Sequence, residues 1–548
     1  MPDDRKITHS WVQPKPIEWI YIAFGLVLVV RYRWLIDDAF VYFRYVDNFL
    51  FLKIGLVYNA GEYVEGFSSP LWALVLLVLR ALRLSFPAIV LILAVGSFAL
   101  FSYGLVVLNR RLAPPGPVVN LPLAFAAGNY SVLTYFSGGL EMPLVQALAV
   151  AYGLLLFFPR SRLLQVAVAI SPLVRHELVL PLVIVLFMVR KEPGVVRRVA
   201  VQGLVAATGW LLFRVYYYAD LLPSTFYLKD DWMLERGLYY VHHTLVTYQL
   251  YWAGALILAL AGLLRIRGVR FDGRQRVSML MMMLPVALYV VKIGGAPIQY
   301  KYLAFPFCLA LAATSGLVET AASRLLRPTL ARWTPLLGLI TVALSLSLYP
   351  PQLSHHPLHA EVEAKSVRAI SDPQWHRKLL SNWHQDWQAV ASPVRQSEFR
   401  EGHKPFAYSR LIRDGLCLRI YEQYDARVVH MFGLTDPFLA RVEVRANRPG
   451  HKRGLFPLAN DLAQLRSHPE SLGRGGLARA VAEGRAPSWV EANLEVMDVI
   501  ERKIYNRHRF LENLGLALTP GLGIKLDKET RRRLRDAQRR RQRAAASH

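Results

Sequence analysis

Apolar residues dominate the first two thirds of the chain, in runs that short polar segments interrupt. Most runs approach the length of an α-helix that crosses a bilayer, about 20 residues. After the last run the hydropathy collapses, and Trp, His, Arg and Asp become frequent. The pattern predicts a polytopic α-helical membrane protein with about 11 transmembrane helices, followed by a polar region. The apolar runs fall near residues 19–36, 86–108, 118–136, 142–158, 163–173, 178–189, 199–218, 241–264, 277–291, 303–318 and 335–348.

Lys and Arg residues between the runs predict how the chain lies across the membrane. If the N-terminus is cytoplasmic, the basic clusters in the turns after residue 109 all fall on the cytoplasmic side, as the positive-inside rule requires. This holds when residues 70–82 form a short helix in the outer interface instead of a full span. The chain has a net charge of +26, and its excess positive charge in the membrane half is largely explained by topology, so we expect no nucleic-acid partner.

The odd number of predicted spans places the polar region outside the cytoplasm. We expect a membrane domain over residues 1–350, with a first outer loop at residues 37–69. Residues 351–524 are long enough for a core of their own, and we expect an extracytoplasmic soluble domain of mixed α/β structure. The basic tail, residues 525–548, is expected to be disordered or to lie against anionic headgroups.

Charged and hydrogen-bonding residues gather on the loops that this topology places outside. Two adjacent carboxylates, Asp37 and Asp38, follow the first apolar run directly. Charges at a bilayer boundary are tolerated where water reaches them, so position alone does not explain the pair. The other outer loops are SGGLE at 137–141, SPLVRHEL at 171–178, LLPSTFYLKDD at 221–231 and KIGGAPIQYKYLAFP at 292–306. This asymmetry predicts a site that faces outward.

The order of these loops carries a resemblance to a known family. The segments DDAF, GLVYNAGEYVEGFSSPLW, SGGLEMPL, LVRHEL, LLPSTFYLK and GGAPIQYKYLAFP resemble the membrane half of the GT-C glycosyltransferase superfamily. VEGFSSPLW and FGLTDPFLAR are similar to segments of the mycobacterial terminal β-(1→2)-arabinofuranosyltransferases. The resemblance implies an inverting transferase in a bacterial cytoplasmic membrane. It would move a sugar, D-arabinofuranose, from a polyprenyl-phosphate donor to an envelope glycan or glycoconjugate on the outer face.

Such a reaction needs a base for the acceptor hydroxyl and cations for the departing phosphate. We interpret Asp37 as the base and Asp38 as an orienting residue, or as the ligand if a divalent metal takes part. The candidate phosphate-binding residues are Arg175, His176, Lys229 and Lys301, and the candidate sugar- or acceptor-binding residues are Glu65, Glu141, Tyr58 and Tyr300.

Structural roles for the same residues stay open. The acids can be a water-facing pair at a helix end or helix caps, and the cations can extend from span ends toward the interface. Tyrosines also suit an interfacial aromatic belt.

Three other functions remain open as alternatives. A ligase with a diphosphate-linked oligosaccharide donor would need denser positive charge in one outer loop. A transporter would place acids near the membrane midplane and repeat its two halves, and neither pattern is visible. A wall-polymer binding protein without catalysis would not need the acid pair. The spacings typical of zinc proteases and P-loop nucleotide hydrolases are missing from the sequence.

Overall fold

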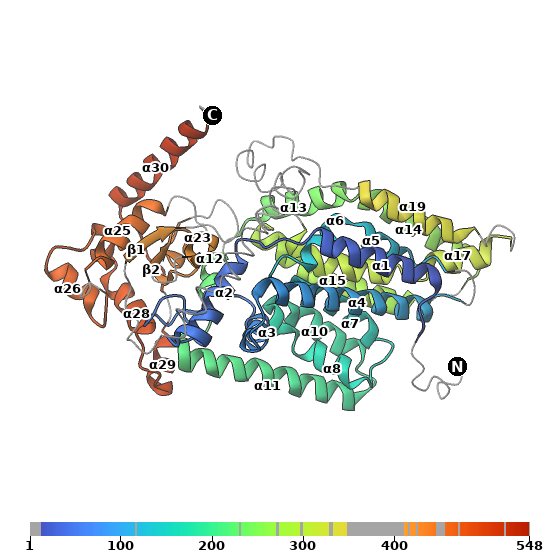
Figure 1. The fold of residues 1–548 in the computed structure, drawn as a ribbon, viewed down its shortest axis with the longest axis horizontal. Coiled ribbons are helices and arrows are strands. Elements are labelled where there is room, and N and C mark those ends of the chain that lie inside the picture. Colours follow the sequence, from blue (N-terminus) through green and yellow to red (C-terminus); the bar gives the residue numbers. More distant parts are fainter. Residues whose placement is uncertain are drawn as a thin grey trace.

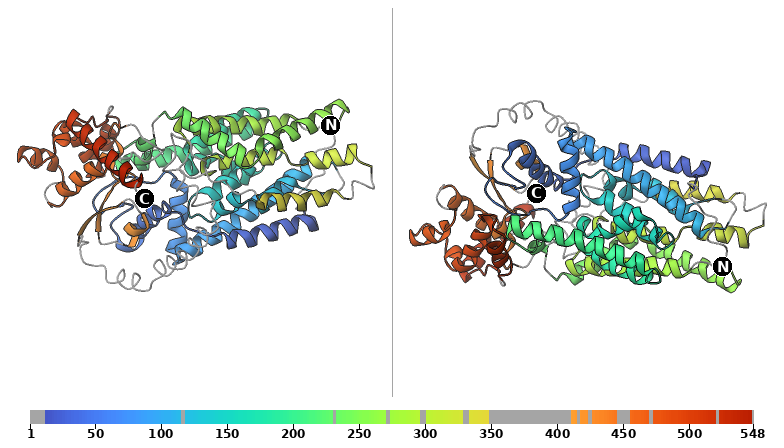
Figure 2. Two further views of the ribbon diagram at one scale, coloured as in Figure 1. Left: turned by 90° about the horizontal axis from the view of Figure 1, so that it is seen from above. Right: turned by 90° about the horizontal axis from the view of Figure 1, so that it is seen from below.

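The chain is mostly helical and elongated (Figure 1). This computed structural model describes residues 12–114, 118–229, 232–269, 273–295, 300–327, 333–347, 410–414, 417–422, 426–444, 455–468, 472–519 and 522–546. The apolar helices run along the long axis. The elements from β1 (Arg410–Asp414) to α30 (Lys528–Ala546), called the C-terminal part below, gather at one end and include α23 (Cys417–Glu422). Figure 2 shows the same division from above and from below.

The membrane part is built from helices of very different length. The longest is α4 (Phe86–Leu112), which Ser85 caps by accepting a hydrogen bond from the backbone N–H of Ala88. The other elements are α1 (Pro16–Arg31), α2 (Ala39–Asp47), η2 (Asn48–Leu52), α3 (Pro70–Ala81), α5 (Leu121–Gly128), α6 (Tyr130–Phe136), α7 (Met142–Leu155), α8 (Arg162–Ala169), α9 (Ser171–Val174), η3 (His176–Leu178), α10 (Val179–Met188), α11 (Pro193–Tyr218), α12 (Ser224–Lys229), α13 (Leu234–Thr247), α14 (Leu250–Ile266), α15 (Gly273–Ile293), η4 (Lys301–Leu303), α16 (Ala304–Ala313), α17 (Leu317–Leu325) and α19 (Thr334–Ser347).

The described residues contain fewer membrane-spanning helices than the apolar runs suggest. Four are long and apolar enough to cross a bilayer, or five if a pair bent by 67° counts as one span. The prediction of a helical membrane protein is thus confirmed, whereas the number of about 11 spans is not. The four are Phe86–Leu112, Pro193–Tyr218, Gly273–Ile293 and Lys301–Leu325, and the bent pair is Leu234–Val246 with Leu250–Ile266.

Polar residues inside the apolar runs explain the shorter helices. Helix α5 ends at Gly128, and the Asn129 side chain then caps α6 by accepting a hydrogen bond from the N–H of Val132. Between the runs near residues 163–173 and 178–189, α9 ends at Val174, the backbone of Arg175 is extended, and η3 begins at His176. A run that reads as one continuous span can therefore contain two helices, because a capping side chain stops the first and starts the second. The segment expected at residues 70–82 does form a short helix, α3.

The first loop, residues 37–69, is folded under the C-terminal part. Its helix α2 is buried along its whole length, including Arg44. The Arg44 guanidinium donates hydrogen bonds to the carbonyl oxygens of Tyr58 at 2.9 Å, Ile420 at 2.9 Å and Ala426 at 2.7 Å. One side chain therefore joins α2, the rest of the first loop and the C-terminal part.

The C-terminal part contains the only sheet among the described residues. Strands β1 (Arg410–Asp414) and β2 (Ala426–His430) pair in parallel, and α23 forms the crossover between them. The core beside this sheet includes Phe438, Trp489 and Ile500, all buried. The predicted mixed α/β domain is not confirmed as such, and residues 351–409 of it lie outside the described part. The remaining helices are α24 (Pro437–Ala440), α25 (Phe456–Arg466), α26 (Gly476–Ala482), α27 (Ser488–Glu491), α28 (Leu494–Ile504) and α29 (Phe510–Ala517).

The basic tail differs from the sequence-based expectation. Residues 525–548 were expected to be disordered or to lie against anionic headgroups, and the structure has helix α30 over Lys528–Ala546. Arg and Ala are good helix formers, and Asp527 accepts a hydrogen bond from the N–H of Thr530 at 2.6 Å at the start of the helix. Charge density alone therefore did not indicate the structure of this segment.

Replacing Arg44 by Lys should loosen the attachment of the C-terminal part. A lysine keeps the charge but cannot reach three carbonyl oxygens in different directions, and each carbonyl left without a donor costs about 1–3 kcal/mol. We expect Arg44→Lys to lower the melting temperature of the full chain in detergent and to speed proteolysis after residue 409. The exposed Arg31, at the end of α1, provides the control. Equal melting of Arg44→Lys and Arg31→Lys would contradict this role.

Candidate functional site

The acid pair lies at the start of a helix. Helix α1 ends at Arg31, the N–H of Ile36 binds the carbonyl of Gly138 at 3.0 Å, and α2 begins directly after Asp38. Carboxylates are favourable at the N-terminus of a helix and unfavourable at its C-terminus, so the acid pair lies at the favourable end of α2. The side chain of Asp38 is 43% exposed, which leaves it accessible to a ligand.

Lys301 connects the acid pair to a distant part of the chain. Its ammonium lies 3.2 Å from Oδ2 of Asp38, and its side chain is only 9% exposed. The residue belongs to η4, at the start of the apolar segment that continues into α16 and α17. The first loop and the loop before α16 therefore meet at one ion pair.

Three cations predicted from separate loops meet at one aromatic ring. The ring centroid of Tyr302 lies 4.7 Å from Cζ of Arg175, 5.8 Å from Nζ of Lys229 and 5.9 Å from Nζ of Lys301. A cation near the face of a tyrosine is attracted by the ring quadrupole. Tyr302, Arg175, Lys229 and Lys301 are called the Tyr302 cluster below. Sequence reasoning missed Tyr302 itself, although it stands next to Lys301.

Arg175 is held in place by two buried carboxylates. Its Nη1 lies 2.9 Å from Oε1 of Glu141, and its Nε lies 2.6 Å from Oε1 of Glu177. Both carboxylates are almost fully buried, so the cation and the acids stabilise one another away from water. Glu141 was considered as a cap or a sugar ligand, but its side chain caps no helix and instead binds Arg175.

The other candidate ligands of a sugar occupy different surroundings. Glu65 is buried and forms an ion pair with Arg214, which ties the first loop to α11. Tyr300 lies in the core of the bundle, where its hydroxyl donates to Oε1 of Gln146 at 3.0 Å. His176 is half exposed, and its Nε2 lies 2.9 Å from the hydroxyl of Tyr289. These contacts connect Glu65, His176 and Tyr300 to three different parts of the molecule.

Tyr58 lies beside the acid pair and is buried. The guanidinium of Arg44 stands 5.0 Å from its ring centroid. Burial raises the pKa of the Tyr58 hydroxyl well above its ordinary value, and negative charge at Cys417 and Asp37 adds to this shift. The hydroxyl therefore stays protonated and able to donate at neutral pH.

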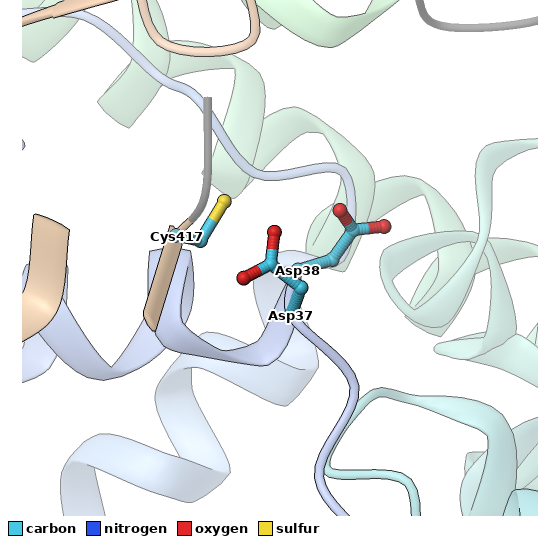
Figure 3. Close-up of side chains that lie close together, drawn as sticks. All are labelled: Asp37, Asp38 and Cys417. Carbon is cyan, nitrogen blue, oxygen red and sulfur yellow. The ribbon is translucent and has the colours of Figure 1, made fainter. Parts of the chain in front are cut away.

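The C-terminal part contributes to this site through Cys417. Its Sγ and one oxygen each of Asp37 and Asp38 all lie within 4.8 Å of one another (Figure 3). The sequence could not indicate this approach, because nearly 380 residues separate the acids from the cysteine along the chain. A short sequence motif cannot reveal a contact between residues so far apart along the chain.

A small cavity lies elsewhere, at the junction with the C-terminal part. Its volume of about 20 Å³ suits one or two water molecules, and Glu65, Asp220, Arg441 and Lys503 are among the residues that line it. Asp220 forms ion pairs with Arg441 and, at 3.5 Å, with Lys503. The cavity is thus an ionic junction between the two parts of the chain and is too small for a sugar.

Comparison with known proteins assigns the chain to no family. No protein-family model matches the chain, and no curated protein matches it. The function has to be inferred from the chemistry of the acid pair and the Tyr302 cluster.

Replacing Glu141, a buried partner of Arg175, should destabilise the protein far more than replacing Glu192, the partner of the exposed Arg160. Glu141→Gln removes one of the two charges that neutralise buried Arg175. We expect a loss of about 3 kcal/mol, the lower end of the range for a broken buried pair, because Glu177 remains. Glu192→Gln breaks the pair with Arg160, whose side chain is 81% exposed, and should cost less than about 1 kcal/mol. Denaturant titration in mild detergent measures both, and similar losses would argue against the buried pair.

Proposed function

We propose that the protein is a glycosyltransferase of the GT-C type, which moves a sugar from a polyprenyl-phosphate donor to an envelope acceptor. The proposed location is the outer face of a bacterial cytoplasmic membrane, with the N-terminus cytoplasmic and the C-terminal part outside. Helices able to span a membrane are present, as a membrane-borne donor requires. D-arabinofuranose is the sugar that the resemblance suggests.

One observation carries this proposal. Cations from three separate loops meet at the ring of Tyr302, and one of them, Lys301, also binds Asp38. A reaction that joins a hydroxyl acceptor to a sugar and releases a phosphate needs an acid pair and a cationic site at this close range. An interfacial aromatic belt would not require Lys301 to contact both the Tyr302 ring and Asp38.

The proposed reaction is a single displacement with inversion at the anomeric carbon. The acceptor oxygen attacks that carbon, the bond from the carbon to the phosphate oxygen breaks, and Asp37 takes the hydroxyl proton. Asp38, held by Lys301, orients the acceptor. The leaving phosphate gains negative charge in the transition state, and the cations of the Tyr302 cluster stabilise it there.

The charges around Tyr302 favour a monophosphate donor over a diphosphate donor. Arg175, Lys229 and Lys301 carry three positive charges, while Asp38, Glu141 and Glu177 carry three negative ones. Lys229 forms no ion pair among the described residues, and Nη2 of Arg175 makes no hydrogen bond there. Lys229 and Nη2 of Arg175 can therefore bind the single negative charge of a phosphodiester. A diphosphate would bring further negative charge without a further cation to neutralise it.

The direct test of this function is a transfer assay on the full chain in nanodiscs. Polyprenyl-phosphate arabinofuranose and an envelope glycan acceptor should give product, whereas a nucleotide sugar should give none. Product formed from the nucleotide sugar alone would overturn the donor assignment. Product formed only from a diphosphate-linked oligosaccharide would instead support the ligase alternative.

Asp37→Asn should abolish transfer without unfolding the protein. The amide keeps the size of the side chain but cannot accept the proton, and general base catalysis contributes about 10²–10⁴-fold. Turnover should fall by that factor while the melting temperature and donor binding stay near those of the wild type. The matched control is Asp498→Asn on α28, where the acid forms a surface pair with Arg502. Near-normal turnover of Asp37→Asn would move the base to another residue.

Lys229→Ala should weaken use of the lipid donor selectively. Losing one charged hydrogen bond to phosphate costs about 1–3 kcal/mol, or roughly 5- to 150-fold in KM for the donor, with the KM for the acceptor little changed. The exposed Lys191, between α10 and α11, is the control. Combining Lys229→Ala with Lys301→Ala should give less than the sum of the two effects, because both cations act on one phosphate. Additive effects would indicate separate sites.

A further inference from the structure

Cys417 is held above the acid pair by the packing of the C-terminal part. It opens α23, which packs on α2 through Ile420 and Tyr421. The Tyr421 hydroxyl donates to Oδ2 of Asp47 at 2.6 Å, and Arg44 binds the carbonyl of Ile420. Cys417 is only 2% exposed, and it is not joined in a disulfide to Cys308, the other cysteine of the chain. These contacts fix it over the beginning of α2, where Asp37 and Asp38 lie.

The thiol and the two carboxylates have the separations that a metal site requires. All three donor atoms lie within 4.8 Å of one another, and Figure 3 shows them on one side of the turn that leads into α2. Bond lengths of about 2.0 Å to oxygen and 2.3 Å to sulfur place tetrahedral ligands roughly 3.5 Å apart. Small rotations of the side chains therefore suffice to bring the three atoms around one cation.

Tyr58 supplies an independent indication of a ligand at this place. Its side chain is 2% exposed, yet its hydroxyl has no hydrogen-bond partner among the described residues. Cys417 and Asp37 are both close enough to act on it electrostatically. A buried hydroxyl without a partner costs free energy, and a water or substrate oxygen bound to a cation would supply that partner.

We propose that Asp37, Asp38 and Cys417 bind one divalent cation, and that Zn²⁺ fits this donor set best. Magnesium and calcium take oxygen ligands, whereas a thiolate beside carboxylates favours zinc or another borderline ion. Three protein ligands leave a fourth position for water or for a substrate hydroxyl. Binding converts the Cys417 thiol to a thiolate bonded to the metal and releases one proton, which His430 can accept, since its Nε2 lies 3.6 Å from Sγ.

Such a cation would connect the first loop, through Asp37 and Asp38, to the C-terminal part, through Cys417. Asp38 can keep its ion pair with Lys301 through Oδ2 and bind the metal through its other oxygen. In the proposed transfer reaction, the cation would lower the pKa of an acceptor hydroxyl at the fourth position and so assist Asp37. That consequence rests on the proposed function, but the metal site itself does not, since its ligands can be tested without any sugar.

The test measures metal bound to the full chain in nanodiscs, with no donor or acceptor present. Metal-free protein is titrated with Zn²⁺, the bound metal is counted by mass spectrometry, and Co²⁺ is used to detect thiolate-to-metal charge transfer by absorption. We expect one ion per chain and the thiolate band in the wild type. Cys417→Ser should lose the band and weaken Zn²⁺ binding at least tenfold, and Asp37→Asn should weaken it as well.

The second cysteine of the chain provides the matched control. Cys308 is buried in the membrane core, away from the acid pair, and Cys308→Ser should keep the band and the stoichiometry. A wild-type protein without the band would overturn the proposal, whether or not the variants fold. Unchanged binding in a folded Cys417→Ser would overturn it too. The transfer assay is separate, so a failed metal titration leaves the proposed glycosyl transfer standing, and the reverse also holds.

Discussion

The site depends on how a buried arginine is neutralised. Arg175 lies inside an apolar bundle, and a charge there is tolerated only where opposite charges and polarisable groups surround it. Glu141, Glu177 and the ring of Tyr302 supply that surrounding, and each comes from a different segment of the chain. The contacts that neutralise Arg175 also hold three segments together: the turn before η3, the loop before α7, and η4. Lys229 and Lys301 are then placed at the same ring, and Lys301 brings Asp38 to it.

A second constraint attaches the C-terminal part to this arrangement. The Arg44 guanidinium binds carbonyl oxygens on the first loop, on α23 and at the first residue of β2, and Asp220 pairs with Arg441 and Lys503. Directional bonds of this kind determine position more narrowly than apolar packing does. Cys417 can therefore stand beside Asp37, although it belongs to the far end of the chain.

The sequence was informative where local patterns decide structure. Apolar runs indicated a helical membrane protein, and the topology inferred from them predicted that Asp37, Asp38, Arg175, Lys229 and Lys301 lie at one boundary. The structure brings the three cations to the ring of Tyr302 and Lys301 to Asp38. The number of spans could not be predicted from hydropathy alone. The apolar run near residues 118–136 is continuous, yet capping by Asn129 divides it into two helices. The pairing of Arg175 with Glu141 and the approach of Cys417 to the acid pair could not be foreseen, since both depend on tertiary contacts between separate segments. Tyr300 shows the same limit: it stands next to Lys301 in the sequence, yet its side chain turns into the core.

The central claim is that the Tyr302 cluster receives the phosphate of a lipid donor beside the acid pair. The most direct measurement is an electron cryomicroscopy map of the full chain in nanodiscs with a non-transferable polyprenyl-phosphate sugar. The account predicts phosphate density within hydrogen-bond distance of Lys229 and Lys301, with the anomeric carbon facing Asp37. A phosphate bound at the basic ends of the helices away from Tyr302, with the cluster empty and its ion pairs unchanged, would contradict it.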